Sequence, residues 1–221
     1  MPTTSDLTVA VQDYLKAIYA LEAAGERVTT SALATRMGVS APSATAMTKR
    51  LAELGLVERA PYRGVALTEE GRSGALEVIR HHRLLERYLV DRLGLSLDEV
   101  HAEADRLEHA LSEELEAKID AELGYPTHDP HGDPIPDAEL RVEPGRDRTL
   151  ADLEPGERAA ISRVPDGDPD LLRYLTELGL IPGSDVEIVA HAPFAGPVTV
   201  RTTSGDHAIS RELADRIGAA T

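Results

Sequence analysis

Four side chains of the types that ligate metals recur at helical spacing in the middle of the chain. The segment 101–109 reads His-Ala-Glu-Ala-Asp-Arg-Leu-Glu-His, and on a helix steps of four, seven and eight residues return to one face. The residues on that face are His101, Asp105, Glu108 and His109. Upstream, His82 and Glu86 are also four residues apart. Because one helix supplies only two or three well-placed ligands, two such faces packed together could hold divalent cations.

A solvated charged surface is the competing interpretation, with the carboxylates paired to Arg83, Arg87 or Arg106. For a single His/Glu pair this surface is the better interpretation, whereas two pairs in one acidic stretch make a metal site equally good on spacing alone. His81 is expected to be an exposed neighbour of His82. No His-Glu-x-x-His motif occurs, which disfavours zinc protease chemistry.

The elements that must position these ligands are mostly helical. Apolar spacing predicts helices over 7–24, 28–37, 41–54, 68–89, 97–108 and 111–123, with short β-prone runs at 56–59 and 64–68. Residues 124–150 carry Pro, Gly and Asp without periodicity, which is typical of a loop. Beyond them, a helix at 168–178 and alternating runs at 185–190, 197–203 and 206–210 predict a small β barrel-like domain. The expected fold is mainly α with small β parts.

The first 75 residues follow the plan of a winged helix-turn-helix, in which a two-stranded wing follows the second helix of the motif. Ser40 ends the tight turn Gly38-Val39-Ser40 and is expected to cap the recognition helix. Small side chains at the start of that helix favour contact with thymine methyls and readout of DNA shape. Those expected to meet base edges are Ser40, Pro42, Ser43 and Ala46. Thr45, Lys49 and Arg50 are expected to contact phosphates, and Arg63 lies at the tip of the wing.

A net charge of −16 conflicts at first sight with a nucleic-acid partner, because phosphate backbones favour basic surfaces. The distribution of the charge removes the conflict. Residues 1–75 sum to about 0, residues 76–145 to about −11 and residues 146–221 to about −5, with a local excess of about +3 within 36–63. The acidic surplus therefore lies mainly in the segment that carries the candidate ligands.

The composition excludes several classes of protein. The chain has no cysteine, which rules out disulfides, thiolate zinc sites, iron–sulfur clusters and a cysteine nucleophile. No stretch approaches the roughly 18 apolar residues of a membrane span, and the N-terminus lacks a signal-peptide pattern. A soluble cytoplasmic protein without a membrane partner is expected.

Segments spread over most of the chain resemble the diphtheria toxin repressor family of iron- and manganese-dependent regulators. The most specific are His-Arg-Leu-Leu-Glu-Arg, which begins at His82, and Val-His-x-Glu-Ala-x-x-Leu-Glu-His, which ends at His109. Further matching segments lie at 13–22, 38–57, 62–72 and 129–136, and 172–189 looks like the SH3-like module of many members. The resemblance implies a winged helix-turn-helix domain over 1–75, a helical dimerisation and metal-binding domain over 76–145, and an SH3-like domain over 146–221.

The resemblance also implies a primary metal site. Its residues would be Asp13, His82, Asp105, Glu108 and His109. Iron-type members place Met and Cys at the positions of Asp13 and Asp105, whereas the two carboxylates of this chain favour hard Mn²⁺. Short two-domain manganese regulators use a Glu one helical turn after the first-helix Asp. Lys16 stands there in this chain, which puts a closely spaced binuclear site in doubt.

A second metal site is implied by the members that carry the SH3-like module. It draws on a Glu that matches Glu86 and on an acidic residue of the module, for which we choose Asp168. His101 joins this site in iron-type members. Asp129 and His131 are chemically plausible additions that fit ordinary turn chemistry equally well.

The sequence thus predicts a homodimeric Mn(II)-dependent repressor of metal-ion homeostasis genes, which binds about two Mn²⁺ per subunit and a pseudo-palindromic operator in double-stranded DNA. Fe²⁺ is expected to replace Mn²⁺ in vitro, and neither an enzymatic activity nor a small organic substrate is expected. Three alternatives stay open: an Fe(II)- or Zn(II)-dependent member of the same family, a winged-helix regulator that senses an organic ligand, and a metal-dependent hydrolase. The hydrolase lacks a nucleophile motif.

Overall fold

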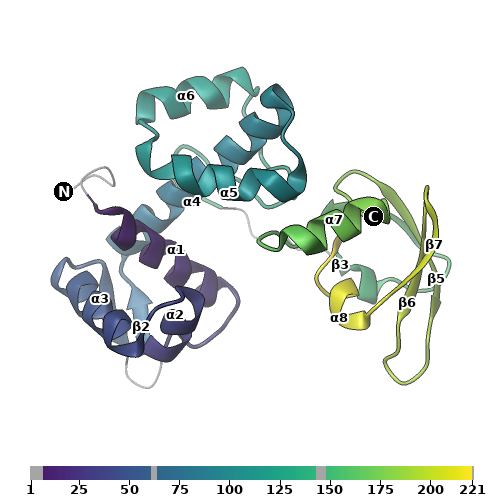
Figure 1. The fold of residues 1–221 in the computed structure, drawn as a ribbon, viewed down its shortest axis with the longest axis horizontal. Helices are drawn as coiled ribbons and strands as arrows, with labels where there is room; N and C mark the ends of the chain where they lie inside the picture. Colours follow the sequence, from purple (N-terminus) through teal and green to yellow (C-terminus); the bar gives the residue numbers. More distant parts are fainter. Residues whose placement is uncertain (1–6, 61–63, 143–147, 221) are drawn as a thin grey trace. The chain divides into compact units, whose positions relative to one another are not determined.

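A computed structural model describes residues 7–60, 64–142 and 148–220. The chain forms two compact units (Figure 1). The first unit comprises the residues up to His82 together with 107–118 and 136–141, and the second comprises 83–106, 119–135 and the residues from 142 onward. The prediction of a mainly α fold with small β parts is confirmed.

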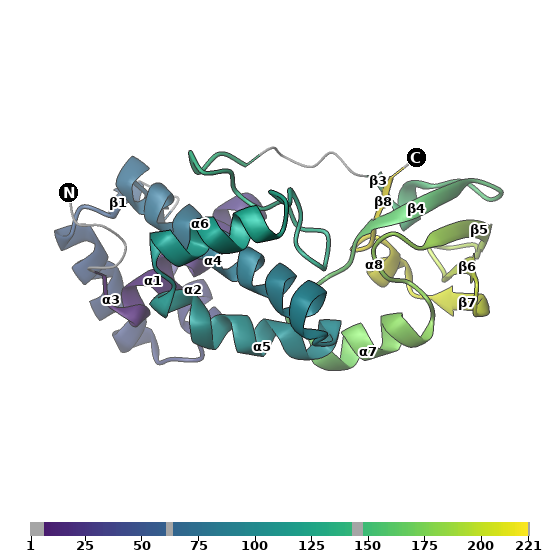
Figure 2. The same ribbon diagram turned by 90° about the horizontal axis from the view of Figure 1, so that it is seen from above.

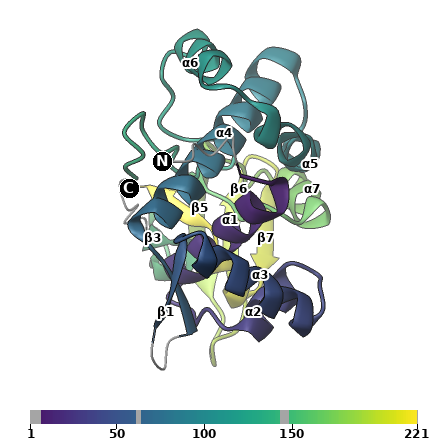
Figure 3. The same cartoon turned by 90° about the vertical axis from the view of Figure 1, so that its left-hand side faces the viewer.

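The first unit opens with three helices and a hairpin. They are α1 (Val9–Ala23), α2 (Thr30–Arg36), α3 (Ala41–Glu53), β1 (Val57–Ala60) and β2 (Gly64–Leu67). The α1 helix buries Leu15, Ile18 and other residues three or four apart, as the apolar spacing predicts. Hydroxyl side chains cap the next two helices, because Thr29 accepts from the backbone of Ala32 and Ser40 from that of Ser43. The hairpin is antiparallel, and α3 packs against β1 (Figure 3).

The middle of the chain is helical but less continuous than expected. Its elements are α4 (Glu69–Leu93), α5 (Leu97–Leu107), the 3-10 turn η2 (Glu108–Ala110) and α6 (Glu113–Glu122). The prediction that 101–109 lies on one α-helix is wrong, because α5 ends at Leu107 and Leu111 is already extended. None of the helices in the described ranges is long and apolar enough to cross a bilayer, α4 included.

The C-terminal part of the second unit is a six-stranded antiparallel sheet in the order β3-β8-β4-β5-β6-β7. Its elements are β3 (Arg148–Thr149), η3 (Leu150–Asp152), β4 (Arg158–Arg163), α7 (Pro169–Glu177), β5 (Asp185–His191), β6 (Val198–Thr202), β7 (Gly205–Ile209), α8 (Arg211–Ala214) and β8 (Gly218–Ala220). Within this sheet β6 lies between β5 and β7 and pairs with both of them (Figure 2). Leu150, Ile161, Leu175, Ile188 and Val200 belong to the core beneath the sheet.

Candidate metal centres

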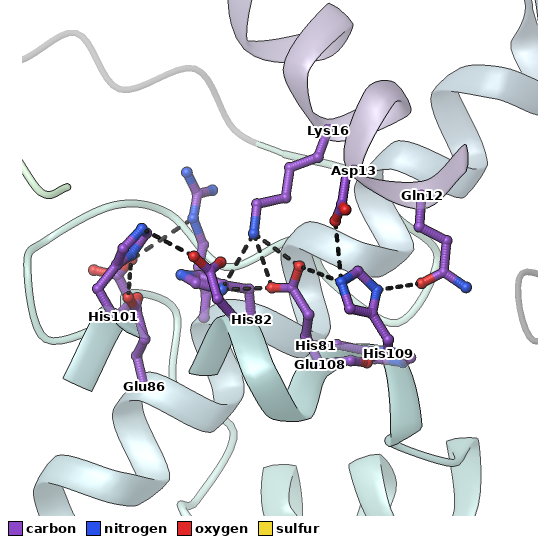
Figure 4. Close-up of polar contacts among 12 residues, drawn as sticks. Gln12, Asp13, Lys16, His81, His82, Glu86, His101, Glu108 and His109 are labelled. Atoms are coloured by element: carbon purple, nitrogen blue, oxygen red, sulfur yellow. Dashed lines mark hydrogen bonds and ion pairs between the residues drawn. The ribbon is translucent and has the colours of Figure 1, made fainter. Parts of the chain in front are cut away.

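Glu108 is a buried carboxylate of the first unit, with 1% of its side chain exposed. Lys16 reaches it from α1 and donates to both carboxylate oxygens, with Nζ 2.9 Å from Oε1 and 2.8 Å from Oε2 (Figure 4). The Nδ1 atom of His82 lies 2.5 Å from the same Oε2. A buried carboxylate is strongly unfavourable without charged or hydrogen-bonding partners, so these two contacts explain how Glu108 stays inside the protein.

His109 is oriented so that one ring nitrogen faces two carboxylates. Its Nδ1–H donates to Oε1 of Gln12 at 2.6 Å. In a neutral imidazole the lone pair then lies on Nε2, which is 3.0 Å from Asp13 Oδ1 and 3.5 Å from Glu108 Oε1 (Figure 4). Such a lone pair repels the carboxylates unless a proton or a metal ion stands between them. Metal-binding histidines are commonly held by their other N–H in this way, and Asp13, Glu108 and His109 bring their ligand atoms within 4.8 Å of one another.

His81 supports the turn that carries Glu108. The prediction that it is an exposed neighbour is wrong, because only 6% of it is exposed. Its Nδ1 lies 3.2 Å from the backbone oxygen of Glu108, and its Nε2 lies 2.8 Å from Glu116 Oε2 on α6. Burial acts to raise the pKa of Glu116, but the hydrogen bonds from His81 and Arg80 outweigh it and lower the pKa. His81 therefore connects the turn to an ionised carboxylate on α6.

A second cluster lies wholly in the second unit, where Glu86, Asp129 and His131 are buried. The Nε2–H of His131 donates to the backbone oxygen of Leu97 at 3.1 Å, so the lone pair of a neutral ring lies on Nδ1, 3.6 Å from Glu86 Oε2. Asp129 accepts from the backbone N–H groups of His131 and Asp133 through Oδ1 alone, both at 2.9 Å. Within the described ranges its Oδ2 has no hydrogen-bond partner, which is unusual for a buried carboxylate oxygen.

The electrostatics of this second cluster also indicate a place for a cation. Burial, followed by the negative charge of Glu86, raises the pKa of Asp129 to about 7. Burial acts to lower the pKa of His131, but the Glu86 carboxylate outweighs it and raises the pKa to about 9. His101 adds a further nitrogen, with Nδ1 3.0 Å from Glu86 Oε1. Oxygen and imidazole ligands that hold protons this tightly fit a divalent ion, which would take the place of those protons.

Two predicted ligands have other contacts in the second unit. Asp168 is exposed and caps α7, where its Oδ1 accepts from the backbone N–H groups of Asp170 and Leu171. In the part of the chain that the structure describes, none of the groups of potential ligands includes Asp168. Asp105 is half-exposed, and its Oδ2 lies 3.6 Å from His101 Nε2.

Sequence reasoning missed the contacts that two side chains of α1 make with residues of the first centre. Gln12 orients His109, and Lys16 neutralises Glu108. The spacing indicated these contacts, because residues three or four apart share a helix face. Gln12 lies four residues before Lys16, and the predicted ligand Asp13 lies three residues before it. Amide and ammonium groups are not metal ligands of the usual kind, so a search for ligand types passes over both.

The predicted DNA-reading residues lie on the exposed side of α3. Ala44, Thr48 and Leu51 face the core of the helical bundle, whereas the predicted contact residues are exposed. The exposed residues are Ser40, Pro42, Ser43, Thr45, Ala46, Lys49 and Arg50. The hydroxyl of Thr45 donates to the backbone oxygen of Ala41, and Lys49 pairs with Glu53 at 3.7 Å. Arg63 lies outside the described residues.

Comparison with known protein families gives three matches in chain order. Residues 6–65 match "Iron dependent repressor, N-terminal DNA binding domain", residues 68–137 match "Iron dependent repressor, metal binding and dimerisation domain", and residues 148–220 match the FeoA domain. The resemblance seen in the sequence is therefore confirmed. The exposed face of α3 lies in the DNA-binding match, and the candidate ligands on α4 and after it lie in the metal-binding match.

Individual relatives agree with this assignment. The iron-dependent repressor IdeR of Mycobacterium tuberculosis is 38% identical over 196 residues, which cover 83% of this chain and 85% of the relative. The diphtheria toxin repressor of Corynebacterium diphtheriae is 31% identical over 226 residues, covering 96% and 97%. A solved manganese-dependent transcriptional repressor in complex with manganese is 42% identical, with a TM-score of 0.85 and coverage of 96% and 99%. These matches define a family of metal-dependent, DNA-binding transcriptional repressors, which are not enzymes. This chain, with a dimerisation domain and a C-terminal FeoA domain, belongs to that iron-dependent (diphtheria toxin) repressor family.

Proposed function

We propose that this chain is a Mn(II)-dependent repressor of metal-ion homeostasis genes. The observation that carries the proposal is the chemistry of the ligands in the two clusters. Every ligand atom is a carboxylate oxygen or an imidazole nitrogen, from Asp13, Glu108 and His109 in the first unit and from Glu86, Asp129 and His131 in the second. Mn²⁺ is a hard ion near the weak end of the divalent series, and soft thiolate or thioether ligands would favour its competitors. The chain has no cysteine.

The proposed division of labour follows the three parts of the chain. Residues 1–75 bind a pseudo-palindromic operator, residues 76–145 form the dimer and hold most ligands, and residues 146–221 form the SH3-like domain. The primary ligands are Asp13, His82, Asp105, Glu108 and His109; the secondary ligands are Glu86, His101, Asp129 and His131. About two ions bind per subunit, and the protein acts in the cytoplasm, where the DNA is.

Asp13 couples metal binding to DNA binding in this proposal. A bound ion supplies the positive charge that lets neighbouring carboxylates stay close together. Asp13 lies on α1 of the DNA-binding part, and its Oδ1 is 3.0 Å from Nε2 of His109 in the turn after α5. When Asp13 and His109 bind the same metal ion, α1 is fixed to that turn, and the recognition helices of the two subunits keep the spacing of two half-sites.

Operator binding tests the proposal. Duplexes selected from a random pool in the presence of Mn²⁺ serve as probes, and fluorescence anisotropy measures affinity with Mn²⁺ or with chelator. We expect Mn²⁺ to raise the affinity at least tenfold in the wild type but not in Asp13→Ala or Glu108→Gln. The control Glu139→Gln removes an exposed carboxylate of the same unit and should keep the full response. Equal affinity with chelator would refute the proposal and favour a regulator that senses an organic ligand.

An iron-dependent regulator is the second candidate, because the relative IdeR is named an iron-dependent repressor. Anaerobic titration with Mn²⁺, Fe²⁺ and Zn²⁺ at the metal levels of a cell separates the two. The double variant Asp13→Met and Asp105→Cys introduces soft ligands and should move the preference toward Fe²⁺ or Co²⁺. An unchanged order of metals in this variant would show that other features of the protein decide selectivity.

A further inference from the structure

The first metal centre contains a cation supplied by the protein itself. The ammonium of Lys16 donates to both oxygens of Glu108 at 2.8 and 2.9 Å, and it lies 3.3 Å from Nδ1 of His82 (Figure 4). Glu108 is also one of the three residues whose ligand atoms converge with those of Asp13 and His109. The ammonium and a metal ion would therefore use the same carboxylate.

The geometry makes these two uses of Glu108 incompatible. A divalent ion bound to this carboxylate would stand close to an ammonium that contacts both of its oxygens, and two cations at such a distance repel each other. Lys16 can yield, because its side chain is 26% exposed and ends a flexible four-carbon stem. Glu108, with 1% exposed, has no comparable freedom to turn toward solvent.

We propose that Lys16 is a tethered competitor of the metal at the first centre. Without metal its ammonium neutralises Glu108, and metal binding displaces it from that carboxylate toward solvent. Lys16 thereby sets the threshold concentration at which the first centre fills, and its charge disfavours a second ion beside Glu108. The inference rests on the proposed function, since it requires that the first centre binds a divalent ion.

Calorimetric titration of the full-length, metal-free protein with Mn²⁺ tests the competition. Lys16→Leu removes the ammonium without adding a ligand atom, and Lys16→Arg keeps a cation. Lys118→Leu is the matched control, because it removes the same charge from an exposed pair with Glu114. We expect Lys16→Leu to lower the Kd of the first centre at least tenfold, which corresponds to about 1.4 kcal/mol. Lys16→Arg should not tighten binding, and Lys118→Leu should match the wild type.

Outcomes of the titration separate the two proposals. A wild-type protein that takes up no Mn²⁺ would refute the proposed function. Binding by the wild type with equal or weaker affinity in Lys16→Leu would overturn the competition alone, as would tighter binding in Lys16→Arg. Circular dichroism and a melting curve of each metal-free variant establish that a folded protein is titrated.

Displacement of the ammonium has its own readout that does not depend on affinity. The chain has only two other lysines, Lys49 and Lys118, whose side chains are 75% and 68% exposed. Brief amidination followed by mass spectrometry reports the accessibility of all three in one sample. We expect labelling of Lys16 to rise at least threefold when Mn²⁺ is added, with Lys49 and Lys118 unchanged as internal standards. Unchanged or reduced labelling of Lys16 by metal would overturn the inference.

Discussion

Gly132 lies where the loop that carries Asp129 and His131 touches the β-rich part of the second unit. Its φ is +93°, and a Cβ added there would lie 1.9 Å from the backbone oxygen of Ser162 and 2.8 Å from Cα of Arg163. Backbone atoms cannot rotate away as a side chain would, so Gly132→Ala must push the loop off β4. The hydrogen bond from the N–H of Val164 to the oxygen of His131, 2.9 Å long, would then break.

The expected loss in the free energy of unfolding has two parts, and the matched variant Gly124→Ala separates them. A left-handed backbone costs an L-residue about 1–2 kcal/mol, and a lost hydrogen bond costs about 1 kcal/mol before any loss of packing. Gly124 also has a positive φ, +75°, but its added Cβ would meet nothing within 4 Å. We therefore expect Gly124→Ala to lower the free energy of unfolding by about 1 kcal/mol and Gly132→Ala by about 3 kcal/mol or more.

Urea denaturation of the metal-free variants measures this difference, and metal titration measures its consequence for the second centre. Displacing the loop moves Asp129 and His131 together, so Gly132→Ala should weaken Mn²⁺ binding at this centre at least tenfold while Gly124→Ala leaves it unchanged. Equal destabilisation by the two variants would show that the close approach to Ser162 contributes nothing. Normal metal binding in a destabilised Gly132→Ala variant would show that the positions of the ligands do not depend on the contact between this loop and β4.

Three further outcomes are expected. Glu86→Gln should reduce bound Mn²⁺ from about two ions to one per subunit by elemental analysis, and two retained ions would place the second centre elsewhere. Because the folded-state pKa values of Asp129 and His131 are raised from 3.8 to about 7 and from 6.5 to about 9, the folded protein binds protons more tightly than the unfolded chain does. The free energy of unfolding in chelator should therefore fall by a few kcal/mol as the pH rises from about 4 to 9, and Asp129→Asn should flatten this dependence below pH 7. The same slope below pH 7 in the wild type and in Asp129→Asn would contradict the raised pKa of Asp129. Ser40→Ala removes the N-cap of α3 and should lower the free energy of unfolding by about 1 kcal/mol and weaken operator binding, as melting and anisotropy would report; an unchanged melting temperature would contradict the capping role.

The sequence was most informative where periodicity and caps agree. In the first 60 residues the apolar spacing and the cap Ser40 predicted three helices whose bounds differ from the observed ones by at most two residues. The strand β4 escaped prediction because Ile161 is its one residue of high strand propensity, and β8 because its buried positions are Gly218 and Ala219. Short elements of this kind are stabilised by the sheet around them and not by local preference.

The candidate sites show the same division between local and tertiary information. Ligand types at helical spacing predicted Glu86, Glu108 and His109, whose possible ligand atoms lie in the two clusters. The spacing could not show that α5 ends at Leu107, because the turn that follows is stabilised by contacts of Glu108 with residues far away in the chain. Asp168, which the resemblance offered as a ligand, caps α7 in the structure, and the sequence alone does not distinguish these two roles of an aspartate that precedes a helix.

The two centres balance their negative charge by different means when no metal is bound. In the first, the Lys16 ammonium lies 2.8 Å from Oε2 of the buried Glu108 carboxylate. In the second, Arg83 lies 3.6 Å from Asp129 Oδ2, and the raised pKa values of Asp129 and His131 favour protons on these two groups. Metal entry should then release an ammonium to solvent at one centre and protons at the other. Mn²⁺ titrations in buffers of different ionisation enthalpy should assign the released protons mainly to the second centre, and Glu86→Gln should abolish most of that release.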